Sequence, residues 1–259
     1  MSAIVKKIGF LVPSSNTVLE PMTSAMVAPL HSVSLHFARL PVTEISLNEN
    51  GLEQFQERRV VDAAELLAHA RVDMVVWNGT AGSWLGLRHD ERLCDAILQA
   101  TGLPASTSTL AFHSIFKRMS VRRIGLVTPY TEDVQRQIVR VWADEGVDCV
   151  SERHLGVRDN FAFGEVSEDV IASMVQDVIE AGSEAVAIVC TNMRGARLAP
   201  ILEAKFGVPV IDSVAVTLKA CMDYLELSTA MLSGWGSIFD LPVEGNSLPS
   251  RQGIAEAAS

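Results

Sequence analysis

The chain has 259 residues, of which 48% are hydrophobic, and its formal net charge is -10 at pH 7. This length and apolar content allow a large core in one or two domains. The negative charge and the scattered Lys and Arg residues argue against a nucleic-acid groove. No segment has the ~18 to 20 uninterrupted apolar residues of a membrane span, and residues 1–7 lead into a strand rather than a signal peptide. We therefore expect a cytoplasmic protein with no nucleic-acid or membrane partner; a homo-oligomer is compatible with the sequence.

Apolar strands and amphipathic helices alternate along the chain. A first strand is expected at Ile8–Pro13, and helices at Gln54–Ala70, Asp133–Glu145 and Ser167–Ala181. Alternating strands and helices build a parallel sheet that is covered by helices on both faces. The sequence therefore predicts the α/β class.

Three strings of this pattern recur 116, 111 and 105 residues later. The pairs are Ile8–Pro13 and Ile124–Pro129, Asp73–Gly79 and Glu184–Cys190, and Leu103–Ala105 and Val208–Val210. They predict two similar half-domains related by a pseudo-twofold duplication, each a mostly parallel sheet with helices on both faces. We expect residues 1–116 to form the first half-domain, 117–216 the second, and 217–259 to pack back on the first. The alternative is a chance likeness between unrelated α/β segments.

Cys190 lies directly after the apolar run Val186–Val189, where the chain turns into a polar loop. The carboxyl ends of strands are where open α/β sheets place their chemistry. Gly79 occupies the matching position in the first half, so the chain holds one site twice and keeps the thiol once. The alternative is that Cys190 is a small buried hydrophobe. We assign no chemistry to the other cysteines, whose spacing suits neither a disulfide nor a zinc site: Cys94, Cys149 and Cys221.

Small polar residues follow four of the expected strands. Hydroxyls, amides and backbone N–H groups at helix starts can hold an anion without any cation, which suits a carboxylate. The candidates are Ser14, Ser15, Asn16, Thr80, Tyr130, Thr131, Thr191 and Asn192. For Ser15, Thr80, Thr131 and Thr191 the alternative role is a helix N-cap.

Cofactor motifs are missing from the sequence. Neither Gly-x-Gly-x-x-Gly nor a Walker loop occurs, and Gly79–Gly82 has one glycine too few. The six histidines are dispersed, so no metal site is predicted. We expect no cofactor and a small-molecule carboxylate as the partner.

Several of these strings resemble the aspartate/glutamate racemase superfamily, in particular the branch that holds maleate cis-trans isomerase and arylmalonate decarboxylase. The resemblance covers residues 4 to about 225 and rests on Pro13–Pro21, Gly79–Ser83, Thr128–Tyr130, Cys190–Asn192 and Val208–Val210. It implies a cofactor-free enzyme with two half-domains, each of which contributes one cysteine to a substrate between them. Racemases and maleate isomerase need both thiols. Gly79 stands at the first position here, as a glycine does in arylmalonate decarboxylase.

The resemblance also implies roles for individual residues. Cys190 would be the proton donor, and Thr80, Tyr130 and the backbone around Thr191 would form the oxyanion pocket. Pro13, Leu40 and Val42 would stand near an apolar wall. Three features depart from the decarboxylase pattern: Ala81 lacks a hydroxyl, Asn16 and Asn160 match the isomerase, and Thr191-Asn192 replace two glycines.

A single thiol is sufficient for decarboxylation, whereas two-base racemization needs a second acid or base across the substrate. We therefore expect a cofactor-independent decarboxylase of a substituted malonate or a related small diacid, with an enediolate intermediate that one cysteine protonates. One alternative is a maleate isomerase-like or amino-diacid isomerase or racemase. The other is a non-catalytic carboxylate-binding protein.

Overall fold

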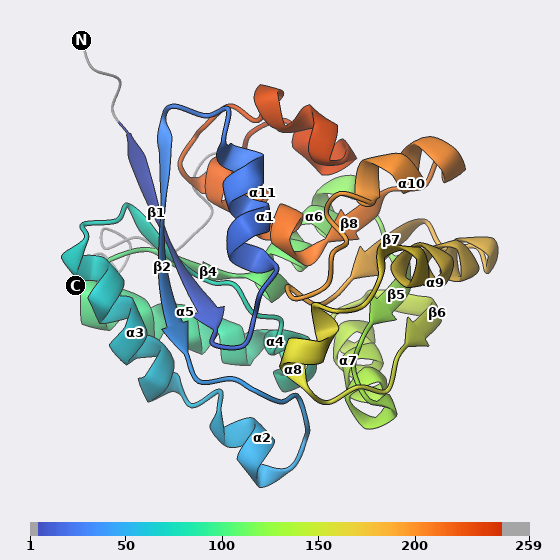
Figure 1. Ribbon diagram of the computed structural model, residues 1–259, viewed down its shortest axis with the longest axis horizontal. Coiled ribbons are helices and arrows are strands. Elements are labelled where there is room, and N and C mark those ends of the chain that lie inside the picture. The colour runs from blue at the N-terminus through green and yellow to red at the C-terminus, as the bar shows by residue number, and fades with distance from the viewer. Residues whose placement is uncertain (1–4, 245–259) are drawn as a thin grey trace.

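The computed structural model describes residues 5–244 and contains two four-stranded sheets, in which all strands are parallel. The first sheet has the order β2 (Val33–Leu40), β1 (Lys6–Pro13), β3 (Met74–Trp77), β4 (Ala105–Thr107). The second has the order β6 (Asp148–His154), β5 (Arg123–Thr128), β7 (Ala185–Ile188), β8 (Val210–Asp212). The strand order is the same in both sheets, which confirms the predicted α/β duplication. The two sheets lie side by side, with α4 and α8 between them (Figure 1).

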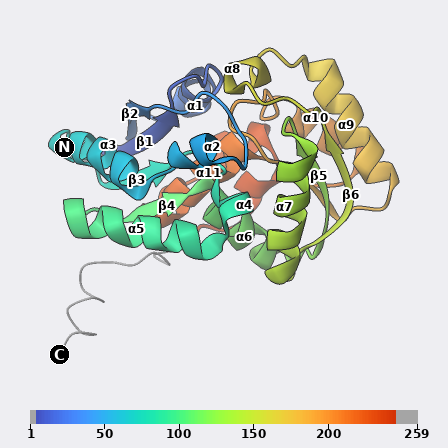
Figure 2. The same cartoon turned by 90° about the horizontal axis from the view of Figure 1, so that it is seen from below.

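Helices connect the strands in both halves. The first half contains α1 (Leu19–Val27), α2 (Glu49–Glu53), α3 (Glu57–His69), α4 (Gly82–Leu85), α5 (Leu87–Thr101) and α6 (Ser108–Met119). The second contains α7 (Glu132–Asp144), α8 (Asn160–Phe163), α9 (Glu168–Glu180), α10 (Ala199–Phe206) and α11 (Ser213–Tyr224), followed by the 3-10 helices η1 (Ala230–Trp235) and η2 (Ser237–Asp240). In the first half α3 and α5 pack on one face of the sheet, and α1 and α11 lie on the other (Figure 2). No helix within residues 5–244 is both long and apolar enough to cross a membrane.

The central strands are apolar on both sides because helices cover both faces of each sheet. All four residues of β3 and all four of β7 are buried. Such runs lack the alternation that would tell which side chains face which helix layer. The sequence therefore predicts these strands but not the direction of each side chain at their ends.

The helix expected at Gln54–Ala70 begins later, at Glu57. The Gln54 side chain instead holds the preceding loop, because its Oε1 accepts from the Thr43 N–H at 2.7 Å and its Nε2 donates to the Glu44 carbonyl at 3.1 Å. The break between α2 and α3 leaves Phe55 buried against the core.

The strand order places the chemistry of each half at one point. From β1 the chain passes outward to β2, whereas from β3 it passes to β4 on the opposite side, so the carboxyl ends of β1 and β3 flank a crevice. The strands β5 and β7 do the same in the second sheet. The loops after these four strands therefore face one another between the two halves.

The proposed division of the chain meets the structure at α6 and α11. The boundary at residues 116 and 117 falls inside α6, and α11 packs against both α6 and α1. We retain the division into residues 1–116, 117–216 and a returning segment 217–259 as a proposal. Residues 245–259 of that segment lie outside the described part of the chain.

Candidate active site

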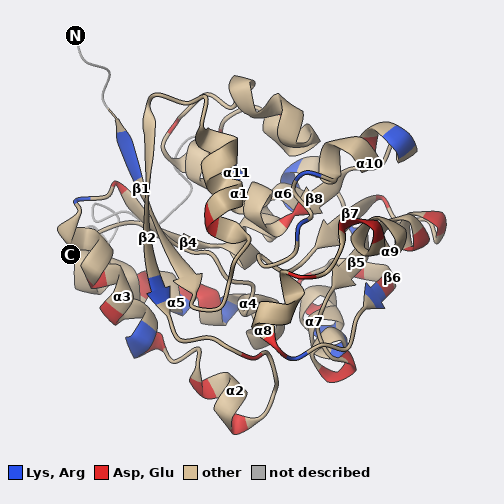
Figure 3. Ribbon diagram, in the orientation of Figure 1, with Lys and Arg blue, Asp and Glu red and all other residues tan. Residues whose placement is uncertain are grey.

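A narrow cavity lies between the halves, at the carboxyl ends of the central strands. Its walls combine apolar side chains with hydroxyl, thiol and amide groups: Pro13, Val42, Ile45, Phe55, Trp77, Gly79, Thr80, Ala81, Trp84, Tyr130, Asn160, Cys190 and Thr191. None of these side chains is charged, and the Lys, Arg, Asp and Glu residues in Figure 3 lie mainly on the outer helices. The cavity can therefore bind a carboxylate only through neutral donors.

Three of the predicted catalytic groups meet inside this cavity. The Tyr130 hydroxyl lies 2.8 Å from Thr80 Oγ1 and acts on the Cys190 thiol to lower its pKa, against the larger effect of burial. Thr80 follows β3, Tyr130 follows β5 and Cys190 follows β7, so both half-domains contribute. The Tyr130 ring is held edge-on by Trp84 and Phe163, with centroid distances of 5.4 and 5.5 Å. The arrangement presents a phenol and a thiol side by side.

Burial keeps both of these acids protonated. Desolvation raises the pKa of Cys190 to about 12, although hydrogen bonds from the Asn192 N–H and from the Tyr130 hydroxyl oppose the shift. Burial also raises the pKa of Tyr130 well above its usual value. At neutral pH the cavity therefore holds a thiol and a phenol, both of which can donate a proton or a hydrogen bond.

The Cys190 loop is fixed by hydrogen bonds to both halves. The Cys190 N–H donates to Ser213 Oγ at 2.9 Å, and the Ser213 hydroxyl donates to the Ile188 carbonyl at 2.7 Å. One residue further on, the Thr191 hydroxyl donates to the Asn78 carbonyl at 3.2 Å, just before Gly79 in the opposite loop. The two catalytic loops are thus tied to each other, which limits their relative motion.

A layer of asparagines joins the halves behind the cavity. Asn16 Oδ1 accepts from the Leu19 N–H at 2.9 Å and so begins α1, while its Nδ2 donates to Thr191 Oγ1 at 3.0 Å. Asn192 Oδ1 accepts from the Thr17 N–H at 2.9 Å. The Asn16 Oδ1 atom also accepts from the Val18 N–H at 3.0 Å, so Asn16, rather than Ser15, Thr80 or Thr191, satisfies the backbone N–H groups at the start of α1.

Asn160 has a defined amide orientation. The Ser15 hydroxyl donates to the Val42 carbonyl at 2.7 Å, so its oxygen accepts from Asn160 Nδ2, also at 2.7 Å. No group within residues 5–244 donates to Asn160 Oδ1. Asn160 therefore offers the cavity an acceptor that is not already paired.

The structure divides the predicted site residues into two sets. Nine line the cavity: Pro13, Val42, Gly79, Thr80, Ala81, Tyr130, Asn160, Cys190 and Thr191. Five lie around it, where their side chains hold the loops or pack in the core: Ser14, Ser15, Asn16, Leu40 and Asn192. Four lining residues were not predicted: Ile45, Phe55, Trp77 and Trp84. Aromatic residues beside the catalytic strings were the only sequence signal for them.

Gly79 lies directly against the indole of Trp77. A Cβ atom built on Gly79 would stand 2.5 Å from Trp77 Cε2 and 3.0 Å from Cη2. Residue 79 does not adopt a positive φ angle, so the backbone does not require glycine there. The adjacent Trp77 ring requires glycine at position 79 instead.

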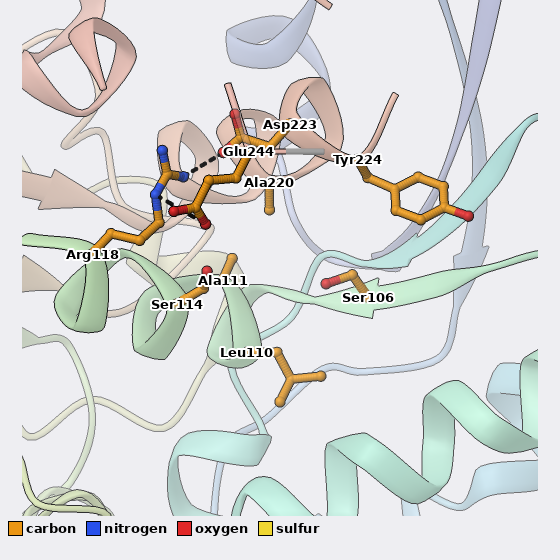
Figure 4. Close-up of a pocket in the computed structure, with 9 residues that line it drawn as sticks. All are labelled: Ser106, Leu110, Ala111, Ser114, Arg118, Ala220, Asp223, Tyr224 and Glu244. Carbon is orange, nitrogen blue, oxygen red and sulfur yellow. Dashed lines mark hydrogen bonds and ion pairs between the residues drawn. The ribbon is translucent and has the colours of Figure 1, made fainter. Parts of the chain in front are cut away.

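A second hollow, with about 60 Å³ open to a water-sized sphere, lies between α6 and α11 (Figure 4). Its charged groups are already paired, because Arg118 contacts Asp223 at 2.6 Å and Glu244 at 3.5 Å. It contains no thiol and none of the predicted site residues. The cavity at Cys190 is therefore the better candidate for catalysis. Within residues 5–244 no three His, Cys, Asp or Glu side chains gather as a metal site would need.

The family is decided by a family model described as arylmalonate decarboxylase, which matches residues 8–239. The chain belongs to the arylmalonate decarboxylase family. This result confirms the resemblance to the branch that holds this enzyme and maleate isomerase.

Curated members of both types are similar to the chain. The arylmalonate decarboxylase of Bordetella bronchiseptica is 27% identical over 70% of this chain and 77% of its own length. The maleate isomerase of Pseudomonas putida is 25% identical over 88% of this chain and 97% of its own. The family is thus clear, whereas the identities do not separate a lyase from an isomerase.

Solved structures of both types share the fold. The crystal structure of the maleate isomerase Iso from Pseudomonas putida S16 superposes with a TM-score of 0.82 at 22% identity, over 91% of this chain and 98% of that one. A crystal structure of arylmalonate decarboxylase superposes with a TM-score of 0.71 at 24% identity, over 90% of this chain and 99% of that one. Within this arylmalonate decarboxylase family fold, the residues of the cavity distinguish the chemistry.

Proposed function

We propose that this protein is a cofactor-independent decarboxylase of a substituted malonate or a related small diacid. The observation that carries the proposal is the single thiol of the cavity: Cys190 lines it from the second half, and Gly79 stands at the matching position of the first. Glycine can neither remove a proton nor add to a double bond. The chemistry therefore needs to proceed with one thiol.

Decarboxylation meets that requirement. The bond between the α-carbon and one carboxylate breaks, its electron pair stays on the α-carbon, and CO₂ leaves. The remaining carboxylate becomes an enediolate, whose added charge the Tyr130 and Thr80 hydroxyls and nearby N–H groups stabilise by hydrogen bonds. Cys190 then donates its proton to the α-carbon and recovers one from solvent. The raised pKa of Cys190 supports this role, because a general acid must be protonated before it acts.

The apolar side of the cavity supplies a driving force. Val42, Ile45 and Phe55 line it without any donor for a carboxylate. A charged carboxylate placed against such a wall is destabilised relative to neutral CO₂. The substrate is also expected to be more polar than an arylmalonate, since Asn160 Oδ1 can accept a hydrogen bond from a hydroxyl or amino substituent.

An isomerase is the second candidate. The asparagine layer and the coverage of the maleate isomerase relative favour it. Addition to a double bond needs a thiolate, however, and burial raises the pKa of Cys190 rather than lowering it.

The test is a paired assay on the purified protein. Malonate, methylmalonate, hydroxymalonate and phenylmalonate are assayed for CO₂ release, and maleate for conversion to fumarate. We expect CO₂ from at least one malonate and no fumarate. Fumarate without CO₂ would replace the proposal with the isomerase. Binding of these acids without turnover would leave a carboxylate-binding protein.

A further inference from the structure

We propose that Trp77 sets the size limit for the substituent on the substrate's α-carbon, so that the site accepts small diacids and excludes those with an aromatic ring. The inference rests on the proposed function, because it names the substrate class of the same cavity. Trp77 is one of the lining residues that motif reasoning did not single out.

The Trp77 ring lies at the edge of the first sheet, against Gly79. Trp77 is the last residue of β3 and pairs in register with Leu11 of β1 and Thr107 of β4, so it stands at the carboxyl edge of the first sheet. Its six-membered ring lies over the Cα of Gly79, as the distances from a built Cβ show. The ring therefore lines the cavity from the first half beside Gly79, and Cys190 lines it from the second.

The Trp77 ring cannot easily move aside. Trp77 is only 1% exposed. Phe55 packs edge-on against it at a centroid distance of 6.4 Å, and Trp84 packs against Phe55 at 5.7 Å. Trp84 in turn contacts Tyr130 at 5.4 Å. Interlocked aromatic rings hold their places, unlike flexible Met or Leu side chains.

Little open space remains inside the cavity. Only about 20 Å³ of the cavity is open to a water-sized sphere, which is room for about one water molecule. Interior packing is too dense to admit an extra ring without displacing a neighbour. A malonate with a hydrogen, methyl or hydroxyl substituent displaces the fewest wall groups, whereas a phenyl substituent has to displace the aromatic wall itself.

The experiment compares the parent with Trp77→Leu and Trp77→Phe. The matched control is Trp142→Leu, which removes another fully buried indole from α7, where Trp142 packs on Phe112 and Phe116 and does not line the cavity. Binding of malonate, methylmalonate and phenylmalonate is measured by calorimetry, and CO₂ release is measured separately. The graded Phe variant retains a ring and provides a second reading where Trp77→Leu folds poorly.

We expect the parent to bind methylmalonate at least about tenfold more tightly than phenylmalonate. Trp77→Leu should raise the affinity for phenylmalonate by about tenfold or more, and Trp142→Leu should leave the preference unchanged. A parent that binds both acids equally well would overturn the inference, and so would an unchanged preference in both Trp77 variants. The expected binding pattern without any CO₂ release would instead overturn the proposed function and leave the size limit in place.

Discussion

The loops after β3 and β7 occupy equivalent places in two sheets of identical strand order, yet they carry different chemistry. The β7 loop presents the Cys190 thiol to the Tyr130 hydroxyl. The β3 loop presents Gly79, over which the Trp77 ring lies. The duplicated scaffold is thus one-sided: one half carries the thiol, and the other carries an aromatic wall. The difference favours a reaction that protonates the substrate from one face.

A buried carboxyl group lies behind each loop, and the two again differ. A Cβ built on Gly82 would stand 2.6 Å from Asp90 Oδ1, and one built on Gly195 would stand 2.6 Å from Asp212 Oδ2. Thr107 donates to Asp90 Oδ2 at 2.5 Å. Asp212 Oδ2 has no partner within residues 5–244. The carboxyl group behind the Cys190 loop is therefore the one that is incompletely paired.

Removing the thiol tests the asymmetry with the largest expected effect. Cys190→Ala should lower the rate of CO₂ release by a factor of about 10² to 10⁴, the usual contribution of one positioned acid, and should leave substrate binding largely intact. Steady-state kinetics and calorimetry measure the two quantities. Cys221→Ala, at a fully buried cysteine in α11, is the matched control and should retain the parental rate. An undiminished rate in Cys190→Ala would show that Cys190 is a buried core residue with no role in the reaction.

The second prediction concerns Asp212 and the pH dependence of stability. Burial raises its pKa from 3.8 to about 7, so the folded state holds this proton more tightly than the unfolded state. The protonated Asp212 therefore adds a few kcal/mol to the free energy of unfolding. This contribution is fully present below pH ~3.8 and is lost as the pH rises through about 7.

Chemical denaturation between pH 4 and pH 8 measures this loss. Asp212→Asn retains the oxygen that caps α11 through the Val214 and Ala215 N–H groups but cannot ionise. The free energy of unfolding of Asp212→Asn should therefore increase relative to that of the parent as the pH rises. Asp159→Asn, at the exposed aspartate that caps α8, is the control and should change little. Parallel curves for the parent and Asp212→Asn would show that Asp212 ionises as an exposed group does.

The third prediction concerns the hydrogen bond donors that belong to the second half. Tyr130→Phe should lower kcat by roughly 10- to 100-fold, because a hydrogen bond to a charged group contributes about 1.5 to 3 kcal/mol and this one strengthens as charge develops. KM should change less than kcat. Tyr224→Phe, at the other tyrosine of the chain, is the control. An equal loss in kcat/KM and in substrate affinity would make Tyr130 a plain binding residue.

The fourth prediction restores the missing thiol. Gly79→Cys alone should cost about 1 to 3 kcal/mol of stability and should not gain racemization, because its Cβ overlaps the Trp77 ring. Gly79→Cys combined with Trp77→Val removes the overlap and places a second thiol across the cavity. The double variant should racemize an α-substituted carboxylic acid, as followed by chiral chromatography. Racemization by the single variant would show that Trp77 does not block this position.

The sequence predicts much of this arrangement because the relevant signals are local. Repeated apolar strings identify both halves and the matching positions Gly79 and Cys190, and polar residues after the strands identify Thr80, Tyr130 and Thr191. The family resemblance adds four more cavity-lining residues: Pro13, Val42, Ala81 and Asn160. The aromatic wall could not be predicted in this way. Trp77 ends a strand that is buried on both faces, so its direction depends on the pleat. Phe55 enters the cavity from the break between α2 and α3, which Gln54 creates through contacts ten and eleven residues away.

The direct test of a one-sided site is the stereochemistry of protonation. Turnover of methylmalonate in deuterated water yields propionate with one deuterium on the α-carbon, and the handedness of that carbon can be measured after coupling to a chiral auxiliary. The structure predicts one hand in large excess, because among residues 5–244 Cys190 is the only thiol that lines the cavity and Gly79 stands at the equivalent position. Racemic label would contradict it.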